Sequence, residues 1–450
     1  MPASPPAAHA ADSTTSMPPQ KQSLAIIGSG WAGFTLSQKA NLSRYNVTVI
    51  SPIRTVQYTP LLASAACGLF NFRLAEEPVR RRHRTALQYY KAVATHIDFA
   101  TRTIRCRTDV KLADGDPNAQ PSTATPDNAD FEVRYDKLCI APGCAIQDFG
   151  TPGAREHALF LRTTNDARII QQRLLEMLDA ASLPTVAPPR QRDLLHIRIV
   201  GGGAIGIEAA AELWDCWHED LRHVYPHLDG KLAITIHDVA PQILGTFDAS
   251  LSEYATKSLE GKQVELKTSN HIERVERDHI VTKEDGRLPF GMLIWATGNK
   301  ASPLIEEMQG VRKPAKGLPR LLTDKYLRVL REDGEPIEGV YALGDAGDIE
   351  GESLPTLAEV ALQKGEYLVD QLNKGDGQPD RPFEYKQRAL LAYLGRHDGV
   401  IGGREEWTGL SAWLAWRSGS LAWTRSWRRK IMISISWLFV WLGGRDIARR

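Results

Sequence analysis

Two short stretches decide the fold of this chain. The first reads Leu24-Ala25-Ile26-Ile27-Gly28-Ser29-Gly30-Trp31-Ala32-Gly33, and the second reads Ile197-Arg198-Ile199-Val200-Gly201-Gly202-Gly203-Ala204-Ile205-Gly206-Ile207-Glu208. Each places Gly-x-Gly-x-x-Gly between a strand-like run and a helix-like run. In such a loop the first glycine permits a tight turn, the second lets the backbone approach a pyrophosphate, and the third lets helix and strand pack closely. One copy is weak evidence, but two copies with these flanks predict two bound dinucleotides.

The obvious pair of dinucleotides is a flavin and a nicotinamide. A chain that holds both is built to pass a hydride between them, and the cofactor supplies the chemistry, so no protein nucleophile or metal is required. The glycines assigned to the cofactors are Gly28, Gly30 and Gly33 for FAD, and Gly201, Gly203 and Gly206 for NADH.

Composition sets broad limits on the fold and the partners. A chain of 450 residues is too long for one core and should form two or three domains. The hydrophobic content of 42% and charged content of 24% are those of an ordinary globular protein. The formal net charge of +1 gives no reason to expect nucleic acid as a partner.

The five cysteines, at positions 67, 106, 139, 144 and 216, form no evident disulfide framework, which favours a reducing compartment. Cys139 and Cys144 have the spacing of a redox pair, but they follow a strand more than a hundred residues after the first glycine loop. A strand-end turn is therefore the favoured interpretation, and a redox disulfide is the alternative. The absence of cysteine beyond Cys216 argues against a sulfide-oxidising quinone reductase.

The predicted fold class is α/β, with two Rossmann-type domains, the second inserted in the first. Strands are expected at 45–50, 137–140, 234–238, 292–298 and 339–345, a helix at 164–180, and a surface loop at 109–130. The expected domains are a disordered tail at 1–22 without a secretory signal or clear transit peptide, an FAD domain at 23–190 and 321–385, an NADH domain at 191–320, and a C-terminal region at 386–450.

Acidic and hydroxyl side chains after the strands are candidates for cofactor contacts. Asp238 ends a strand and should accept the adenosine ribose hydroxyls of NADH while repelling a 2′-phosphate; its alternative role is to cap a turn. The equivalent position in the first unit is Ser51, which offers no charge. Asp345 suits a bond to the flavin ribitol, although it also suits a helix cap. Glu208, early in its helix, either stands beside the nicotinamide or only stabilises the helix.

Taken together, these motifs resemble those of a known family, the type II (non-proton-pumping) NADH:quinone oxidoreductases, most closely the fungal mitochondrial enzymes. The resemblance covers roughly residues 23 to 450. Besides the two glycine loops, it is carried by Ser51-Pro52, Tyr58-Thr59-Pro60-Leu61-Leu62, Glu212-Leu213, Leu293 to Lys300, Ala392-Tyr393-Leu394-Gly395 and Trp441-Leu442-Gly443-Gly444-Arg445-Asp446-Ile447.

The resemblance implies site residues as well as a fold. The family's quinone-site segment Ala-Gln-x-Ala-x-Gln corresponds to Ala358–Gln363, where Gln363 is kept but the first glutamine is Glu359. It implies that Glu208 and Gln363 act in catalysis and that Glu359, Gln363 and Lys364 meet the quinone. The remaining implied contacts are Gly28, Gly30, Trp31, Ala32, Gly33, Ser51, Pro52, Thr59, Leu61, Gly344, Asp345 and Ala361 for FAD, and Gly201, Gly203, Gly206, Asp238, Ala296, Thr297 and Gly298 for NADH.

The C-terminal segment favours a membrane surface. From 404 to 450 the chain has nine Arg or Lys against three acids, and seven of its eleven tryptophans. Ile431 to Leu442 is apolar apart from two serines, but as a helix it would span only about 18 Å, short of the roughly 30 Å hydrocarbon core. Tryptophan and arginine suit an interfacial anchor or, alternatively, a dimer interface. The segment from about Gly409 onward is not expected to contribute to either dinucleotide site.

These observations predict a peripheral membrane flavoenzyme that moves a hydride from NADH to FAD and two electrons on to a quinone, with ubiquinone expected. By the resemblance it is a homodimer on the mitochondrial inner membrane. Two rivals remain, a soluble NADH-dependent flavoprotein reductase and a regulatory flavoprotein similar to apoptosis-inducing factor. The tryptophan-rich tail argues against the first rival, and two complete nucleotide loops argue against the second.

Overall fold

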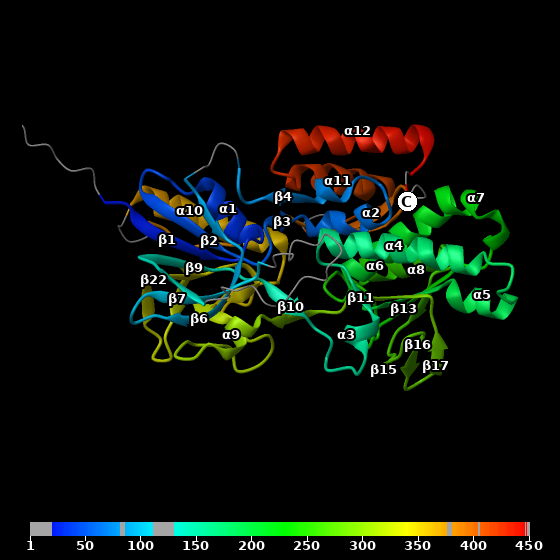
Figure 1. The fold of residues 1–450 in the computed structure, drawn as a ribbon, viewed down its shortest axis with the longest axis horizontal. Helices are drawn as coiled ribbons and strands as arrows, with labels where there is room; N and C mark the ends of the chain where they lie inside the picture. The colour runs from blue at the N-terminus through cyan, green and yellow to red at the C-terminus, as the bar shows by residue number, and fades with distance from the viewer. Residues whose placement is uncertain are drawn as a thin grey trace, which may run out of the picture.

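The structure is a computed structural model, and it describes residues 20–81, 86–110, 130–375, 380–403, 406–445 and 447. Most of the expected N-terminal tail, and the expected surface loop from 111 to 129, therefore lie outside the described residues. Figure 1 shows two α/β units side by side, with the C-terminal helices lying across both of them.

The first unit is built on an eight-stranded sheet in the order β23-β20-β21-β22-β9-β1-β2-β5. Its parallel centre runs from β22 to β5, and the apolar side chains of β1 are buried on both faces of the sheet, as expected of a parallel sheet covered on two sides. The strands are β1 (Gln22–Ile27), β2 (Tyr45–Ile50), β5 (Gln88–Tyr90), β9 (Lys137–Ile140), β20 (Leu321–Thr323), β21 (Arg328–Leu330), β22 (Pro336–Ala342) and β23 (Gly347–Ile349).

Two helices cover one face of this sheet and a small sheet covers the other (Figure 1). Helices α1 (Trp31–Lys39) and α10 (Ala358–Lys374) pack closely because α10 has Gly365 at the contact, where a Cβ would lie 3.1 Å from the carbonyl oxygen of Ala32. The opposite face carries the antiparallel strands β6 (Ala92–Asp98), β7 (Thr103–Thr108) and β8 (Phe131–Arg134), with the short helix α9 (Pro303–Glu307).

The second unit has a fully parallel sheet in the order β11-β18-β12-β13-β14. Its first strand comes from residues 159–160, within the range that we assigned to the first unit from the sequence. The strands are β11 (Leu159–Phe160), β12 (His196–Val200), β13 (Ala233–His237), β14 (Glu265–Lys267) and β18 (Met292–Trp295), and the main helices are α4 (Thr164–Ala181), α6 (Ala204–Cys216) and α8 (Ala249–Gly261). A three-stranded antiparallel sheet adds β15 (Ile272–Val275), β16 (His279–Thr282) and β17 (Gly286–Pro289).

The chain crosses between the units twice, and the two crossings pair with each other. Strand β10 (Cys144–Ile146) leaves the first unit after β9, and β19 (Asn299–Ala301) returns from the second unit after β18. The two crossing strands form an antiparallel pair. The predicted α/β fold with one dinucleotide unit inserted in another is therefore confirmed.

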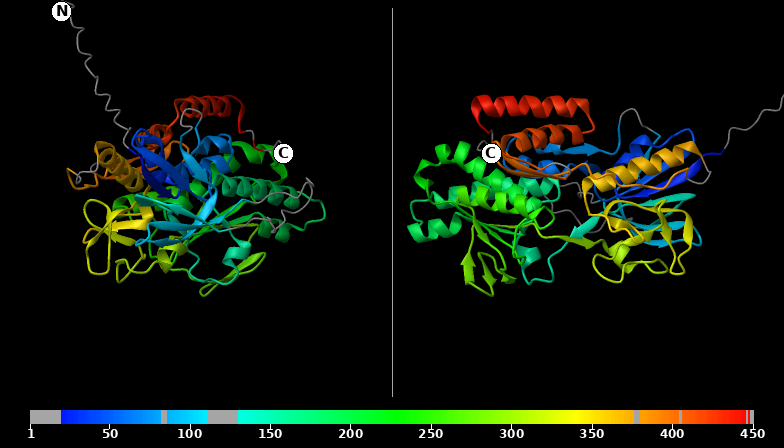
Figure 2. Two further views of the ribbon diagram at one scale, coloured as in Figure 1. Left: turned by 60° about the vertical axis from the view of Figure 1, so that its left-hand side comes forward. Right: turned by 180° about the vertical axis from the view of Figure 1, so that it is seen from behind.

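The C-terminal residues form a third layer. Strands β24 (Ala389–Gly395), β25 (Asp398–Gly403) and β26 (Trp407–Thr408) make an antiparallel sheet against the second unit, and helices α11 (Gly409–Trp423) and α12 (Trp427–Gly443) follow. Figure 2 shows α12 outermost, with α11 between it and the rest of the molecule. Among the described residues, no helix has the length and apolar character needed to cross a bilayer.

The remaining short elements connect these layers. The sequence-predicted strands agree with β2, β9, β13, β18 and β22 to within a few residues, and the predicted helix is α4. The short elements are β3 (Thr55–Gln57), η1 (Thr59–Leu61), α2 (Leu62–Ala66), η2 (Phe72–Ala75), β4 (Glu76–Pro78), α3 (Ala154–His157), α5 (Pro188–Leu194), η3 (Trp217–Leu221), α7 (Arg222–Val224), η4 (Pro226–Leu228) and η5 (Gly344–Ala346).

Candidate functional site

The two glycine loops have the same geometry. Gly28 has φ +96°, and a Cβ there would lie 2.1 Å from the carbonyl oxygen of Ala141. Gly201 has φ +112°, and a Cβ there would lie 2.6 Å from the carbonyl oxygen of Ala296. Both backbone conformations favour glycine, and both close approaches exclude any side chain. The first position of each loop must therefore be glycine, because the backbone at the end of a neighbouring strand occupies the space of a side chain.

The third glycine of each loop brings the helix against its own loop. A Cβ on Gly33 would lie 2.1 Å from the carbonyl oxygen of Gly28, and a Cβ on Gly206 would lie 2.0 Å from that of Gly201. These contacts leave no room for alanine. They hold the first turns of α1 and α6 directly over the strands that precede them.

The second glycine differs from the other two. Among the described residues other than the chain neighbours, nothing lies within 4 Å of where a Cβ would stand on Gly30 or on Gly203. These residues are the N-caps of α1 and α6, and no side chain in the described part of the chain caps either helix. Each helix therefore presents its free N–H groups to open space, which is the arrangement that binds a phosphate group. The two loops fit the pyrophosphates of two dinucleotides.

Asp238 joins the end of β13 to the second glycine loop. Its Oδ2 accepts a hydrogen bond from the backbone N–H of Gly202, and its Oδ1 accepts one from Ala240 N at 2.7 Å. Asp238 thus caps its own turn and also lies at the glycine loop. Turn capping and ribose binding, the two roles considered from the sequence, are therefore compatible in one carboxylate. A carboxylate placed there keeps further lone pairs for ribose hydroxyls.

Ala296, Thr297 and Gly298 extend β18 beside the same loop. Ala296 N donates to Val200 O at 2.8 Å, and Thr297 Oγ1 donates to the backbone oxygen of Gln147. Gln147 N in turn donates to Gly298 O at 3.3 Å. The carboxyl ends of β12, β13 and β18 therefore meet at one edge, where ligands bind in open α/β sheets.

The residues assigned to FAD gather around the first loop. A Cβ on Gly344, whose φ is +61°, would lie 3.2 Å from the Cβ of Ala361 and 4.0 Å from that of Ala32. Asp345 follows in η5, and burial raises the pKa of its carboxyl, although Arg162 and Arg320 oppose the rise. Three distant segments of the chain thus converge beside the first loop.

Ser51 is occupied within its own loop. Its hydroxyl oxygen lies 3.0 Å from that of Ser29 and accepts a hydrogen bond from Ile53 N at 3.2 Å. Ser29 donates in turn to Ile53 O at 2.7 Å. The hydroxyl therefore fixes the loop after β2. A bond from Ser51 to the adenosine of FAD stays a prediction.

Other residues implied as flavin contacts lie nearby. Pro52 and Thr59 are exposed, and Leu61 is buried. Trp31, the first residue of α1, packs against Tyr58 with ring centroids 5.5 Å apart. Its Nε1 is buried without a hydrogen-bond partner among the described residues.

Charged residues that the sequence reasoning missed surround Asp345. Arg162 donates to Cys144 O at 2.7 Å and to Asn299 Oδ1. Arg320 donates to Asp348 Oδ2 and, at 2.8 Å, to Leu354 O. No motif marks these arginines in the sequence. Their place could have been suspected only from the strand ends that they join.

Lys364 lies in this charged group rather than at a surface. It is fully buried, its Nζ donates to Gly347 O at 2.9 Å, and burial lowers the pKa of its ammonium group to about 8. Contact between Lys364 and a quinone, as the resemblance implies, stays a prediction.

Glu359 and Gln363 lie one turn apart on α10 and are joined to each other. Gln363 Nε2 donates to Glu359 Oε1 at 2.7 Å and to Lys386 O at 2.9 Å, while Lys386 N donates back to Gln363 Oε1 at 3.1 Å. Arg388 lies 3.3 Å from the Glu359 carboxylate. A cavity of about 640 Å³ borders this segment and is lined by Thr246, Phe247, Asp248, Tyr385, Lys386, Gln387, Leu390, Gly402 and Gly403.

Glu208 faces the C-terminal layer. Its Oε1 accepts hydrogen bonds from Tyr393 N at 3.3 Å and from Trp416 Nε1 at 3.1 Å. Burial raises the pKa of its carboxyl to about 8, and the charge of Glu212 adds to the rise. Its predicted place beside the nicotinamide stays a prediction. Trp416 of the tail donates to Glu208, and Trp423 packs on Trp31 with centroids 6.3 Å apart. The tail therefore contacts one residue assigned to each dinucleotide site, which we did not expect from the sequence.

Cys139 and Cys144 are free thiols in this structure. Cys139 is buried within β9, and burial raises the pKa of its thiol. Burial also raises the pKa of Cys144 to about 12. A thiolate is the reactive form of cysteine, so both environments disfavour redox reactivity.

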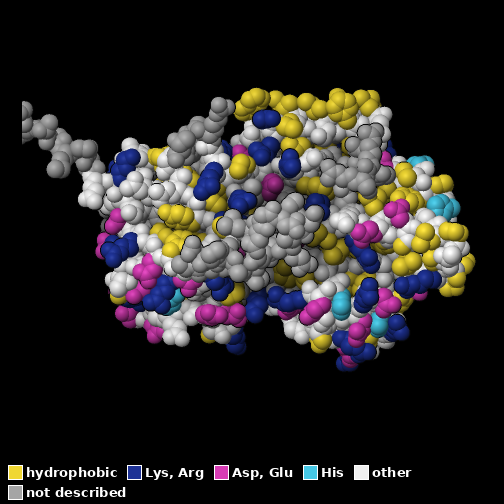
Figure 3. All heavy atoms as spheres, viewed as in Figure 1, with side chains coloured by type: hydrophobic (Ala, Val, Ile, Leu, Met, Phe, Trp, Pro, Cys, Tyr) yellow, Lys and Arg dark blue, Asp and Glu magenta, His cyan; other side chains and the backbone are white. Residues whose placement is uncertain are grey.

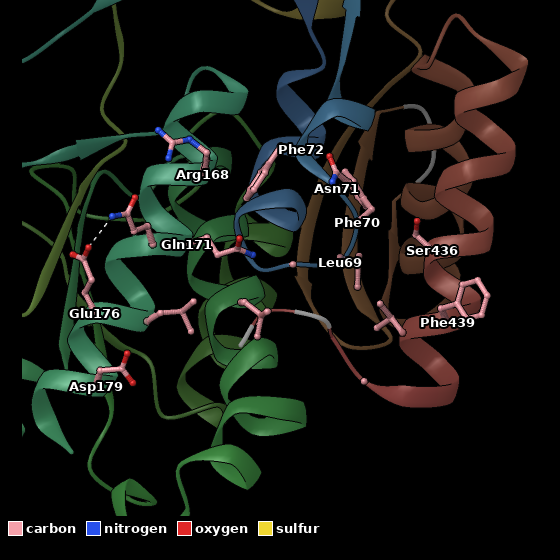
Figure 4. Close-up of a pocket in the computed structure, with 16 residues that line it drawn as sticks. Leu69, Phe70, Asn71, Phe72, Arg168, Gln171, Glu176, Asp179, Ser436 and Phe439 are labelled. Carbon is pink, nitrogen blue, oxygen red and sulfur yellow. Dashed lines mark hydrogen bonds between the residues drawn. The ribbon is translucent and has the colours of Figure 1, made fainter. Parts of the chain in front are cut away.

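A second cavity lies at the seam between the core and the C-terminal helices. It measures about 700 Å³ and separates α4 from α12. In Figure 4, Arg168, Gln171, Glu176 and Asp179 extend from α4, while Ser436 and Phe439 extend from α12. None of the residues assigned to FAD or NADH lines it. It is therefore separate from the two dinucleotide loops.

Comparison with known proteins adds to this geometry. The profile of the family described as "Pyridine nucleotide-disulphide oxidoreductase" matches residues 22–365. The "Internal alternative NAD(P)H-ubiquinone oxidoreductase A1, mitochondrial" of Solanum tuberosum is 34% identical, over 96% of this chain and 88% of its own length. The "External alternative NADH-ubiquinone oxidoreductase, mitochondrial" of Yarrowia lipolytica is 31% identical, over 96% of this chain and 81% of its own.

The fold is also that of a solved structure. The structure of NDH2 from Plasmodium falciparum in complex with NADH superposes with a TM-score of 0.84, covering 95% of this chain and 100% of that one at 21% identity. At that identity the match establishes the fold alone.

Proposed function

We propose the function of this protein from one premise, which is that the chain belongs to the pyridine nucleotide-disulphide oxidoreductases and, among them, to the alternative (type II) NADH:ubiquinone oxidoreductases. It transfers a hydride from NADH to a non-covalent FAD and passes two electrons to a membrane quinone without pumping protons. The observation that carries this proposal is the pair of glycine loops, each with an open second glycine at an uncapped helix N-terminus.

The first unit holds FAD. The N–H groups of α1 and the backbone at Gly30 meet its pyrophosphate, and Asp345 bonds its ribitol. When bound, FAD supplies the redox chemistry, accepting a hydride from NADH and giving two electrons to the quinone. Arg162, Arg320 and Lys364 lie near the Asp345 and Asp348 carboxylates, so the proposed flavin site is bordered by a buried group of paired charges.

The second unit holds NADH. Gly203 and the first turn of α6 meet the pyrophosphate, and Asp238 accepts the ribose hydroxyls. Ala296 to Gly298 form the adjacent edge of the site, where the crossing strands bring the second unit toward the first. The protein's part is to hold the two rings in contact and to exclude water.

The quinone binds beside α10. Gln363 hydrogen-bonds the backbone of Lys386, which lines the 640 Å³ cavity, and is joined in turn to Glu359. An amide can donate to a quinone oxygen, and a carboxylate can accept from a quinol hydroxyl. Glu359 replaces the family's first glutamine.

The membrane partner is supported by the outer face of α12. Figure 3 shows hydrophobic side chains covering that surface, with Lys and Arg side chains beneath it. The inner face of α12 packs against the core through Ile433, which is fully buried. The exposed apolar side chains of α12 are Trp427, Ile431, Met432, Ile435, Leu438, Phe439, Trp441 and Leu442. An apolar face with adjacent cations suits a helix lying in the bilayer interface.

The relatives support a cellular location for this protein. The names of these relatives call them mitochondrial, which supports a mitochondrial location for this protein. We extend this to a peripheral enzyme of the inner membrane that works as a homodimer. Sedimentation of the detergent-solubilised enzyme would test the dimer.

Expression followed by fractionation tests the proposal as a whole. The protein should appear in the membrane fraction and catalyse NADH-dependent reduction of ubiquinone, with one FAD per chain. The rival, a soluble flavoprotein reductase, predicts full activity with a water-soluble acceptor and none with quinone. Recovery of a soluble protein of that kind would replace the proposal.

A further inference from the structure

Arg445 lies at a junction of three parts of the chain. Its side chain is only 2% exposed, and its guanidinium lies 3.5 Å from Glu212, 3.3 Å from Glu219 and 3.1 Å from Asp220. It also donates to Cys67 O at 3.1 Å. These partners belong to α6, to η3 and to the end of α2, whereas Arg445 itself follows α12. An arginine enclosed by three carboxylates and a backbone carbonyl holds these neighbours in one arrangement, because its charged guanidinium pairs with all of them at once.

Glu212 extends the junction to both dinucleotide units. It is buried on α6, and its Oε1 accepts a hydrogen bond from Ser64 Oγ on α2. Helix α6 begins directly after Gly203 of the NADH loop. Helix α2 begins directly after η1, which contains the flavin-site residues Thr59 and Leu61. The Arg445–Glu212 pair therefore connects the first helix of the NADH loop to the segment that borders the flavin.

The backbone beside Arg445 is shaped for the same contact. Gly444 has φ +78°, and a Cβ there would lie 2.7 Å from Asp220 Oδ1. That same carboxylate oxygen accepts a hydrogen bond from Arg445 N at 2.9 Å. The chain thus leaves α12 in a conformation that places the arginine into the junction.

The opposite end of α12 is fixed to the first unit. Arg425 lies 3.6 Å from Glu366 on α10, and Arg429 lies 3.9 Å from the buried Glu77 on β4. Since a helix is a stiff rod, α12 links the first unit at its start to the second unit at its end (Figure 1).

We propose that Arg445, acting through Glu212, is a positioning residue for hydride transfer, because it sets the NADH loop at its working distance from the flavin site. The inference rests on the proposed function. Hydride transfer requires reacting atoms about 3–3.5 Å apart, and a displacement of about 1 Å can reduce the rate about 100-fold. A residue that fixes α6 against α2 therefore affects the rate of flavin reduction without touching either cofactor.

The test measures the reduction of bound FAD by NADH in rapid mixing, with the full-length enzyme in detergent and no quinone. Arg445→Gln should lower the limiting rate by about 10-fold or more, while the concentration of NADH giving half the limiting rate changes by less than about 3-fold. Arg445→Lys should recover part of the rate. Glu212→Gln should also lower the limiting rate. The double variant should be no slower than the slower single variant, because both substitutions break the same Arg445–Glu212 contact.

The control variant is Arg274→Gln, which breaks a surface ion pair with Glu276 at 3.3 Å in the same unit and should leave the rate unchanged. Rates are expressed per bound FAD, so loss of cofactor is not counted as slow transfer. If Arg445→Gln fails to fold, Arg445→Lys and Gly444→Ala take its place, and both should be slower than wild type. Wild-type rates in all folded variants would overturn the inference. A wild-type flavin that NADH does not reduce would instead overturn the proposed function.

Discussion

At the scale of single residues, the acids of the second unit differ because their surroundings differ. Asp238 lies at a strand end, where both of its carboxylate oxygens accept hydrogen bonds from backbone N–H groups. Glu208 lies in the interior, where burial raises its pKa to about 8. Asp238 is therefore held in place beside the NADH loop, whereas Glu208 keeps a proton at neutral pH.

Asp238 should determine the choice between NADH and NADPH. We expect wild-type enzyme to prefer NADH by at least about tenfold in kcat/KM, about 1.4 kcal/mol, because the carboxylate repels a 2′-phosphate. Asp238→Asn should narrow that preference, as measured with both donors at constant ionic strength. Asp229→Asn is the matched control, since Asp229 caps a turn at Gly230 in the same unit without facing the loop. Equal use of NADPH by the wild type would show that Asp238 has another role.

Glu208 should make stability depend on pH. Its folded pKa is raised from 4.5 to about 8, so the folded protein keeps a proton that the unfolded chain has released. Its contribution to stability is therefore complete below pH 4.5 and is lost as the pH rises to about 8, at up to about 1.4 kcal/mol per pH unit. Urea unfolding between about pH 5 and about pH 8 should show a steeper loss in wild type than in Glu208→Gln. Parallel curves would mean that Glu208 titrates normally.

At the scale of elements, α12 has two faces with different tasks. The inner face packs on the core, and Arg417 of α11 lies over the ring of Trp437 at 4.2 Å from its centroid. The outer face exposes Leu438 and Leu442 at 53% and 65% of their surface. A helix whose outer face is apolar along its length should lie flat in the interface.

Polar substitutions on that outer face should release the enzyme from membranes. Leu438→Gln combined with Leu442→Gln should weaken binding to anionic vesicles, because each leucine that moves from water into the bilayer contributes about 1.5–3 kcal/mol. Quinone reduction should fall more than ferricyanide reduction, since a soluble acceptor reaches the flavin from water. Leu183→Gln, at an equally exposed leucine outside the tail, is the control. Unchanged vesicle flotation in the double variant would exclude α12 as the anchor.

At the scale of the whole molecule, the sequence predicted what is encoded locally and missed what is assembled from distant segments. Gly28 and Gly201 were predictable because their loops lie between adjacent strand and helix. Arg162 and Arg320 were not, since single arginines without a motif reach their partners only after the strands converge. Arg445 lies 233 positions from Glu212, and no short-range pattern connects them. The tail was predicted to serve as a membrane anchor or a dimer interface, but Trp416 and Trp423 also contact Glu208 and Trp31, which are assigned to the two candidate sites.

The central claim is that one chain carries electrons from NADH through FAD to quinone. The most direct test is anaerobic rapid mixing of the purified enzyme, first with NADH and then with ubiquinone in lipid vesicles, while the flavin absorbance is followed. We expect one FAD per chain, loss of the oxidised flavin absorbance on adding NADH, and its return on adding ubiquinone. A protein that neither contains nor takes up FAD, or a flavin that NADH leaves oxidised, would rule out this function.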